Sequence, residues 1–270
     1  MPSADLTAGI QAEISGSVSG QVAVGTHILQ IGSVHGGVVN VAVPEQRPVP
    51  RPRAAPVLLR PRPFPGFLGR EDEVESAVAA LRAARPVQLS GPPGAGKTSL
   101  LRHVAHHAVT ASFPGGVAFL SALRQPADDL LQSLFEALFQ TDAPLKPTRT
   151  ELCLLFQGWQ ALVVLDDVEL PREEMERLQD TAPGCTFLWS APERQAWGET
   201  RALPLDGLDA AEARALVERE LERPLDAAEQ AELDALRQAT GGYPLALLQS
   251  AARVREEGIP LREVVARLRA

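Results

Sequence analysis

The chain contains 270 residues, 45% of them hydrophobic, and its formal net charge of −8 argues against a generally basic surface for nucleic acid. No apolar run approaches the ~20 residues needed to cross a bilayer, and the start of the chain lacks a signal-peptide pattern, so we expect no membrane partner. Cys153 and Cys185 lie in apolar segments without metal-ligand spacing, which favours buried free thiols in a globular, cytoplasmic protein over a disulfide framework.

Residues 1–43 are rich in Gly, Val, Ser and Ile and are almost free of charge. The sequence GSVSGQV at 16–22 is followed sixteen positions later by GSVHGGV at 32–38, which predicts two equivalent strand units. The stretch 28–41 combines high β propensity, little charge and no proline, so it is suited to stacking on another copy of itself. A small hairpin packed on the rest of the chain and a disordered tail are the alternatives. A fibre assay on a peptide of residues 1–43 separates the three.

Residues 44–65 alternate proline with arginine. Proline at this density favours an extended polyproline II backbone and removes main-chain donors. We therefore expect a semi-rigid linker that holds the two flanking parts of the chain apart.

From residue 66 to 208, short apolar runs alternate with amphipathic segments, which is the pattern of alternating strands and helices. The runs are nearly continuous in apolar residues, which fits strands covered on both faces of a parallel sheet. We therefore expect an α/β domain whose parallel β-sheet is flanked by helices. The predicted strands span 86–90, 116–120, 161–166, 185–190 and 202–205. The predicted helices span 72–84, 97–109, 127–140, 150–159 and 172–181.

The stretch SGPPGAGKTS, residues 90–99, matches G-x-x-x-x-G-K-[ST] between a predicted strand and a predicted helix. Glycines let the loop surround a polyphosphate with backbone N–H groups, and the following helix adds its positive N-terminal end. Lys97, one of two lysines in the chain, reaches the β- and γ-phosphates as a compact charge that a planar guanidinium replaces poorly. The candidate nucleotide-binding residues of this loop are Gly91, Pro92, Pro93, Gly94, Ala95, Gly96, Lys97, Thr98 and Ser99.

The run ALVVLDD delivers Asp166 and Asp167 to the carboxyl end of a predicted strand, where ligands gather in parallel sheets. Thr98 and Asp166 are expected to hold Mg²⁺, the aspartate through the water shell of the ion. Asp167 is expected to polarise the attacking water, and Lys97, Asp166 and Asp167 are the predicted catalytic residues. The helix after the loop is expected to dock on the sheet through residues four apart, namely Leu100, Val104 and Ala108.

After residue 208 the strand-like runs stop and only helical patterns follow. Asp209 with Glu212, and Asp226 with Glu229, have the spacing of capping boxes, so each pair predicts the start of a helix. We expect residues 209–270 to form a small helical subdomain behind the 66–208 domain.

With these motifs, residues 66–255 resemble a STAND-class P-loop NTPase, similar to the NB-ARC and NACHT-type ATPases of bacterial regulators and immune receptors. Gly69 and Arg70 in FLGRED resemble the family's motif near the adenine and ribose. The stretch 203–217 resembles the entry to its helical ARC1-like domain, and GGYPLAL resembles its Gly-x-Pro signature, which implies Tyr243 and Pro244 against the base. The resemblance implies ATP and ADP with Mg²⁺ as ligands, weak ATPase activity, an ADP-locked closed state and homo-oligomerisation with ATP.

Two features depart from the family. Where it often has an arginine after the fourth strand, this chain has Ala191, so Ser190 and Arg194 are the candidates to read the γ-phosphate. The winged-helix domain and repeat sensor of the family do not follow the helical segment. We expect either a partner that supplies the sensing or a shortened form of a longer receptor.

Residues 29–32, LQIG, resemble the core of amyloid signalling motifs, including the RIP homotypic interaction motif. This resemblance implies an effector protein with a similar motif, in bacterial immunity or signalling. One alternative is an AAA+-type ATPase of the origin-binding or loader kind that acts on DNA or protein. Another is an interaction module whose nucleotide is bound without turnover.

Overall fold

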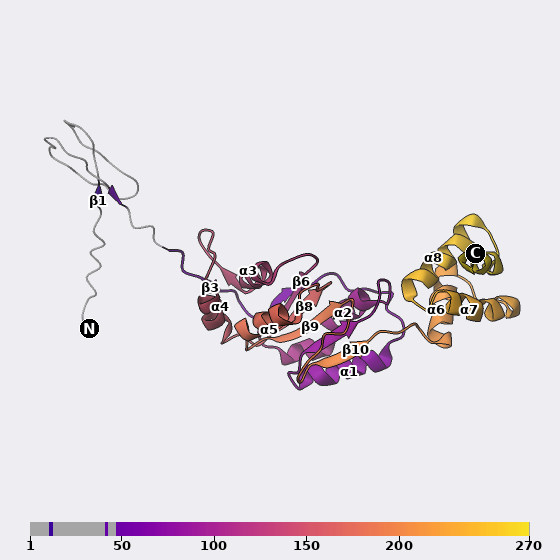
Figure 1. Cartoon of the computed structure of the whole chain (residues 1–270), viewed down its shortest axis with the longest axis horizontal. Coiled ribbons are helices and arrows are strands. Elements are labelled where there is room, and N and C mark those ends of the chain that lie inside the picture. The colour runs from indigo at the N-terminus through magenta and orange to yellow at the C-terminus, as the bar shows by residue number, and fades with distance from the viewer. Residues whose placement is uncertain (1–10, 13–40, 43–46, 270) are drawn as a thin grey trace, which may run out of the picture. The chain divides into compact units, whose positions relative to one another are not determined.

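The structure, a computed structural model, describes residues 11–12, 41–42 and 47–269 in two compact units, Met1–Val49 and Pro50–Ala270 (Figure 1). In the first unit, β1 (Gln11–Ala12) pairs with β2 (Val41–Ala42) in antiparallel fashion. The repeats at 16–22 and 32–38 and the LQIG stretch lie outside the described residues, so the expected β assembly stays a prediction. Among the described residues, no helix has both the length and the apolar character needed to span a bilayer.

The second unit contains a six-stranded sheet whose strands are all parallel, in the order β10-β5-β9-β8-β6-β4. Every residue of β5 and β9 is buried, as expected for strands covered on both faces. The predicted α/β fold with a parallel, helix-flanked sheet is therefore confirmed. The strands of this sheet are β4 (Val57–Leu59), β5 (Val87–Ser90), β6 (Gly116–Ser121), β8 (Ala161–Asp166), β9 (Thr186–Ala191) and β10 (Arg201–Pro204).

Helices cover both faces of the sheet, α1 on one side and α3 on the other in Figure 1. Alternate residues of β8 enter the two cores: Leu162 and Val164 pack with α1 and α2, and Val163 and Leu165 pack with α3, α4 and α5. The helices are α1 (Glu71–Arg82), α2 (Lys97–Ala105), the 3₁₀ helix η1 (Ala108–Ser112), α3 (Ala127–Leu138), α4 (Arg149–Phe156) and α5 (Arg172–Thr181).

Helix α2 is shorter than the expected 97–109, and the predicted docking stripe is wrong at one position. The helix ends at Ala105, and Ala108 opens η1 with its side chain exposed. The side chain of His107 accepts a hydrogen bond from the backbone N–H of Val109 at 3.0 Å, so it caps η1 instead of continuing α2. The helix packs on the sheet through residues that are fully buried, namely Leu100, Leu101, Val104 and Ala105.

The structure differs from the expected 44–65 linker, because residues 51–68, here called the edge segment, lie on the α/β domain. β3 (Arg51–Pro52) pairs with β7 (Phe139–Gln140), and β4 adds a parallel strand to the edge of the sheet beside β6. A Cβ on Gly116, whose φ is +94°, would overlap the backbone of Val57. The high proline content of this stretch favours a linker in the sequence-based prediction, although edge strands tolerate proline well.

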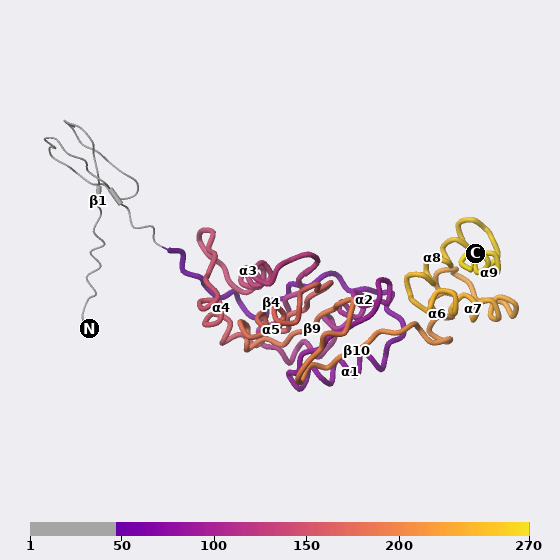
Figure 2. Tube along the Cα trace, viewed as in Figure 1, coloured from indigo at the N-terminus to yellow at the C-terminus, as the bar shows by residue number. Residues whose placement is uncertain are grey.

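A helical subdomain follows β10, as the trace in Figure 2 shows. Asp209 and Asp226 cap α6 and α7, each in a complete capping box with the glutamate three residues later, as predicted. The four helices share one apolar core that includes Leu216, Leu236 and Leu247. They are α6 (Ala210–Leu221), α7 (Ala227–Ala239), α8 (Pro244–Glu257) and α9 (Leu261–Arg269).

Candidate functional site

The glycine-rich loop lies between β5 and α2, at the carboxyl end of an interior strand of the sheet, next to the edge strand β10. Gly94 and Gly96 have φ values of +83° and +93°, a region that glycine enters without steric cost. At Gly94 a Cβ would come within 2.9 Å of the Cβ of Leu245, so the loop backbone also approaches the start of α8 closely. The strand, loop and helix predicted from the sequence are therefore all present.

Lys97 is buried at the first position of α2, with only 9% of its surface exposed. Its ammonium group donates hydrogen bonds to the carbonyls of Gly91 at 2.7 Å and Pro92 at 3.1 Å. Burial lowers the pKa of Lys97, while the nearby charges of Asp167 and Asp166 raise it. Since no ion pair joins Lys97 to a carboxylate in the described part of the chain, its charge is free to balance an anion held by the loop.

Asp166, the last residue of β8, is joined to two other elements through one carboxylate oxygen. Its Oδ1 accepts a hydrogen bond from Thr98 Oγ1 of α2 at 3.1 Å and another from Ser190 Oγ of β9 at 2.8 Å. Hydroxyl and carboxylate oxygens are the donor set that Mg²⁺ prefers. Residues 47–269 contain no group of three or more His, Cys, Asp and Glu that could hold a metal. The pair therefore fits an ion that takes its other ligands from phosphate and water.

Asp167 has a left-handed backbone, with a φ of +59° that is uncommon for a residue other than glycine. Its backbone N–H donates a hydrogen bond to Ser190 Oγ at 2.8 Å. The pKa of Asp167 is raised by burial and by repulsion from Asp166 and Glu169, and Lys97 partly opposes the shift. Strain and a raised pKa at one carboxylate are typical of a functional position.

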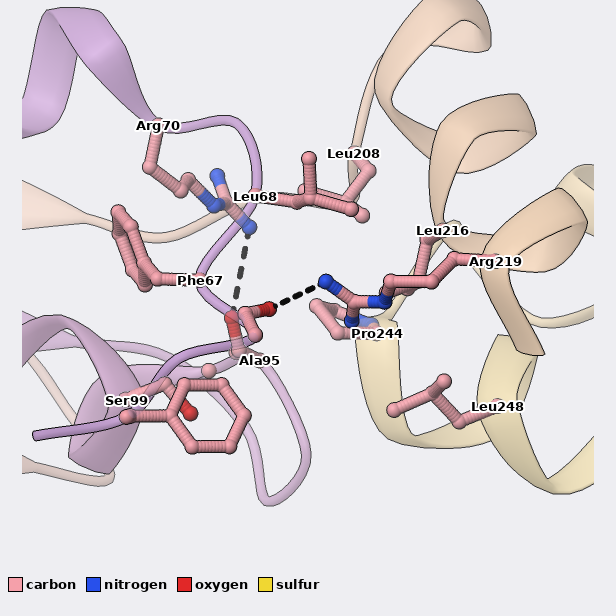
Figure 3. A pocket seen from close by; sticks show the side chains of 13 residues that line it. Phe67, Leu68, Arg70, Ala95, Ser99, Leu208, Leu216, Arg219, Pro244 and Leu248 are labelled. Atoms are coloured by element: carbon pink, nitrogen blue, oxygen red, sulfur yellow. Dashed lines mark hydrogen bonds between the residues drawn. The ribbon is translucent and has the colours of Figure 1, made fainter.

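A mainly apolar pocket lies between the α/β domain and the helical subdomain, enclosing about 460 Å³ with its open mouth included (Figure 3). Phe67, Leu68 and Ala95 form one wall, and Leu216, Pro244 and Leu248 lie opposite them. A second, open hollow, which spans about 800 Å³ with its mouth included, extends over Lys97, Thr98 and Asp167. The two hollows share four lining residues, namely Gly96, Ser99, Pro244 and Leu248.

Arg70 lines the first pocket, yet its guanidinium group is occupied by the protein. It donates to Glu73 at 2.6 Å, to the carbonyl of Ala95 at 3.4 Å and to the carbonyl of Asp206. The residue is buried, with 7% of its surface exposed. Arg70 thus connects the start of α1 to the glycine-rich loop and to the segment that leads into the helical subdomain.

Arg219 of α6 is a pocket residue that sequence reasoning missed. It reaches from the helical subdomain to the carbonyl of Gly66, to which it donates a hydrogen bond of 2.7 Å (Figure 3). In the sequence it is one of several arginines on a mostly polar helix face, and only the packing of α6 against the edge segment distinguishes it. The sequence carries no signal that marks it.

The Gly-x-Pro segment brings the helical subdomain to the loop. The N–H of Leu208 donates to the carbonyl of Gly242 at 2.8 Å, and the N–H of Leu245 donates to the carbonyl of Gly94 at 3.3 Å. Pro244 lines both hollows, as expected, whereas Tyr243 packs against the core beside α1 and α2 and lines neither. The base contact expected of Tyr243 therefore stays a prediction that these hollows do not support.

The two residues expected to replace the missing arginine are placed differently. Ser190 is fully buried, with its hydroxyl bonded to the acidic pair. Arg194 is exposed in a loop that is held by Gln88. The side chain of Gln88 donates a hydrogen bond to the carbonyl of Glu193 at 3.1 Å and accepts one from the N–H of Gln195 at 2.9 Å. Ala191 is buried at the end of β9.

Glu212 fastens the helical subdomain to the segment before α1. Its Oε1 accepts the N–H of Arg70 at 2.8 Å, and its Oε2 accepts the N–H of Asp209 at 2.9 Å. Gly69 has a φ of +68°, which favours glycine, and a Cβ there would displace this carboxylate. One side chain therefore completes a helix cap and joins two subdomains.

We expect Glu212→Ala to lower the free energy of unfolding by about 2 kcal/mol, because it removes a cap and an inter-subdomain hydrogen bond worth roughly 1 kcal/mol each. Glu229→Ala is the matched control, since Glu229 completes the same capping box on α7 and bonds otherwise only to the exposed Arg223. Urea unfolding of both variants measures the difference. A loss for Glu212→Ala no larger than that for Glu229→Ala would contradict the expected contribution of the bond to Arg70.

No family model matches this chain, and no curated protein matches it. Among solved structures, it is similar to a Walker-type ATPase of Pyrococcus abyssi, with 16% identity over 78% of this chain and 74% of that one and a TM-score of 0.51. It is also similar to a STAND protein with a tetratricopeptide repeat sensor from Pyrococcus horikoshii, with 21% identity and a TM-score of 0.49. That alignment covers 70% of this chain and 30% of the STAND protein.

The AMPPCP-bound DnaA from Aquifex aeolicus is a further similar structure, with 19% identity over 74% of this chain and 66% of that one and a TM-score of 0.47. The likeness to the Walker-type ATPase, together with the loop and sheet described above, confirms the predicted P-loop NTPase fold. At these identities the likeness concerns the fold.

Proposed function

We propose that the chain is a nucleotide-dependent switch of the STAND type, which binds ATP and ADP with Mg²⁺ and hydrolyses ATP slowly. One observation carries the proposal. The apolar pocket and the hollow over Lys97 meet at Gly96, Ser99, Pro244 and Leu248, so one ligand with an apolar base and a charged phosphate tail fills both. A nucleotide has that division of polarity.

The apolar pocket suits the base of the nucleotide. Phe67, Leu68, Pro244 and Leu248 offer apolar surface from opposite walls, and burial of a ring between such walls is favourable at about 25 cal/mol per Å². Because Arg70 is occupied by Glu73 and two carbonyls, we assign it to holding the walls together instead of reading the base.

The glycine-rich loop suits the phosphates. Lys97 exchanges its two carbonyl partners for phosphate oxygens, and the N-terminus of α2 adds its partial positive charge. Bound Mg²⁺ supplies charge neutralisation and orients the phosphates, with Thr98 and Asp166 as the residues that hold it. Asp167 orients the attacking water and accepts its proton.

The helical subdomain gives the switch its readout. It supplies one wall of the pocket, and the N–H of Leu245 is bonded to the carbonyl of Gly94 in the phosphate loop. A change in the phosphate tail therefore acts on a contact between the two subdomains. Homo-oligomerisation with ATP, and a relay to an effector through residues 1–43, belong to the same proposal and rest on the sequence resemblance.

Isothermal titration calorimetry with Mg²⁺ tests the proposal. We expect one ADP or ATP per chain, with ADP bound at least about tenfold more tightly than pyrophosphate, because the base adds apolar contact worth more than about 1.4 kcal/mol. Pyrophosphate as tight as ADP would mean that the apolar pocket takes no part. Absence of binding by both ADP and ATP to the folded protein would contradict the proposed function.

A further inference from the structure

Ser190 makes hydrogen bonds to three consecutive residues at the end of β8 and just after it, namely Asp166, Asp167 and Val168. It is the second-last residue of β9, its side chain is fully buried, and the strand ladder between β8 and β9 ends one residue before it at Leu165 and Trp189. Beyond that point, three hydrogen bonds from Ser190 replace the ladder. Its hydroxyl donates to Asp166 Oδ1 and accepts from the N–H of Asp167, both at 2.8 Å, and its carbonyl accepts from the N–H of Val168 at 2.8 Å.

This geometry conflicts with a role in reading the γ-phosphate. A hydroxyl group has a single proton to donate, and that of Ser190 is committed to Asp166. One acceptor site of the oxygen is filled by Asp167, and the group has no exposure to solvent. To donate to a phosphate, Ser190 would have to break its hydrogen bond to Asp166.

We propose that Ser190 is a positioning residue that fixes the orientation of Asp166 and Asp167, and that it does not contact the nucleotide. The inference rests on the proposed function, because it concerns how that site holds Mg²⁺ and water. Its effect on the ligand passes entirely through the two aspartates.

The orientation of Asp166 follows from its two hydroxyl partners. Thr98 approaches Oδ1 from α2 and Ser190 approaches the same oxygen from β9, so the carboxylate is held by two separate elements. In the described part of the chain, no hydrogen bond reaches Oδ2. Oδ2 is thus the oxygen left for the water shell of the metal, and loss of Ser190 frees the carboxylate to rotate.

The orientation of Asp167 depends on Ser190 through the backbone. The left-handed conformation at a φ of +59° is unfavourable for most residues and needs support from its surroundings. Two consecutive N–H groups donate to Ser190: that of Asp167 to its hydroxyl oxygen and that of Val168 to its carbonyl oxygen. The direction in which the Asp167 carboxylate leaves the strand is therefore set by one serine.

The test measures how much Mg²⁺ increases the affinity for ADP, by calorimetry with Mg²⁺ and with EDTA. We expect Ser190→Ala to reduce this Mg²⁺-dependent gain by about tenfold, as loss of a group that orients a metal ligand does, and to leave ADP and ATP affinities in EDTA unchanged. Thr186→Ala is the control, since Thr186 is a buried hydroxyl residue at the other end of β9. We expect it to leave the gain unchanged.

A double-mutant cycle separates the two roles. If Ser190 acts through Asp166, then Ser190→Ala adds nothing to the loss caused by Asp166→Asn. A residue that reads the γ-phosphate would instead weaken ATP more than ADP in EDTA, and its effect would add to that of Asp166→Asn. A larger loss for ATP than for ADP in EDTA, or an effect that adds to that of Asp166→Asn, would overturn the inference.

Ser190→Cys keeps the measurement possible if the alanine variant does not fold, because the thiol has a similar shape but is a weak hydrogen-bond donor. We expect it to lose the Mg²⁺ gain as Ser190→Ala does, and a gain equal to that of the unmodified protein would sink the inference. Absence of nucleotide binding by the unmodified protein would instead remove the proposed function.

Discussion

Replacing Lys97 with alanine is expected to weaken ADP binding by about 100-fold, because charge-assisted hydrogen bonds to phosphate contribute roughly 1.5–3 kcal/mol and each 1.4 kcal/mol is a factor of ten. The ammonium group is buried in the loop and is bonded to carbonyls that compete weakly with a phosphate. Calorimetry in the presence of Mg²⁺ measures the loss. Lys146→Ala is the matched control, since it removes the other lysine of the chain from an exposed loop and should leave the affinity unchanged.

Lys97→Arg tests whether charge alone is sufficient at this position. Arginine keeps the positive charge but brings a broad, planar group into a space in which the ammonium lies within 3.1 Å of two loop carbonyls. We expect this variant to bind ADP far more weakly than the unmodified protein. Full affinity with arginine would show that the compact shape of lysine is not required.

The sequence predicted best those elements that local chemistry determines. β8 has the predicted bounds 161–166 and α5 has the predicted bounds 172–181, because a continuous apolar run and an amphipathic helix after Pro171 are local patterns. The caps at Asp209 and Asp226 are equally local. The phosphate loop lies in its predicted setting for the same reason.

The remaining features depend on contacts between distant residues. The proline content of the edge segment predicts a linker, because that prediction uses the local sequence alone. In the structure, the segment is held by strand pairing with β6 and β7 and by the hydrogen bond from Arg60 to the carbonyl of Ala105. The end of α2 is likewise set from outside the helix. His106 Nε2 lies 2.7 Å from the carbonyl of Pro61, a contact that no helical pattern contains.

The site residues likewise divide into those that sequence motifs predict and those that only the packing of distant segments brings together. Thr98 and Asp166 are joined by a hydrogen bond, and the charge of Asp166 acts on Lys97, because their motifs fix both their residue types and their places in the sheet. Arg219 and Glu212 reach the pocket only through the packing of α6 against residues 66–70. The family resemblance places Arg70 beside the ribose, whereas its three protein partners in the structure are 3, 25 and 136 positions away in the sequence.

Replacing Asp167 with asparagine is expected to lower the single-turnover rate of ATP hydrolysis by about 100-fold or more, which is the usual contribution of a positioned general base. Asparagine has nearly the same shape and tolerates the left-handed backbone, so ADP affinity should stay within about threefold of the unmodified protein. Rapid quench of radiolabelled ATP under enzyme excess measures the rate. An unchanged rate would exclude Asp167 as the base. Absence of hydrolysis by the unmodified protein despite tight ADP binding would favour nucleotide as a structural ligand.

The pH dependence of that rate provides a second check on Asp167. Its pKa is raised from the ordinary 3.8 by burial and by its acidic neighbours, so protonation removes the base at a higher pH than for a free aspartate. The rate should therefore fall on acidification through the raised pKa, and the residual rate of Asp167→Asn should lack this step. In Glu169→Gln, loss of one repelling charge should move the step to lower pH while the rate at neutral pH is kept. A step that does not move would mean that another group titrates.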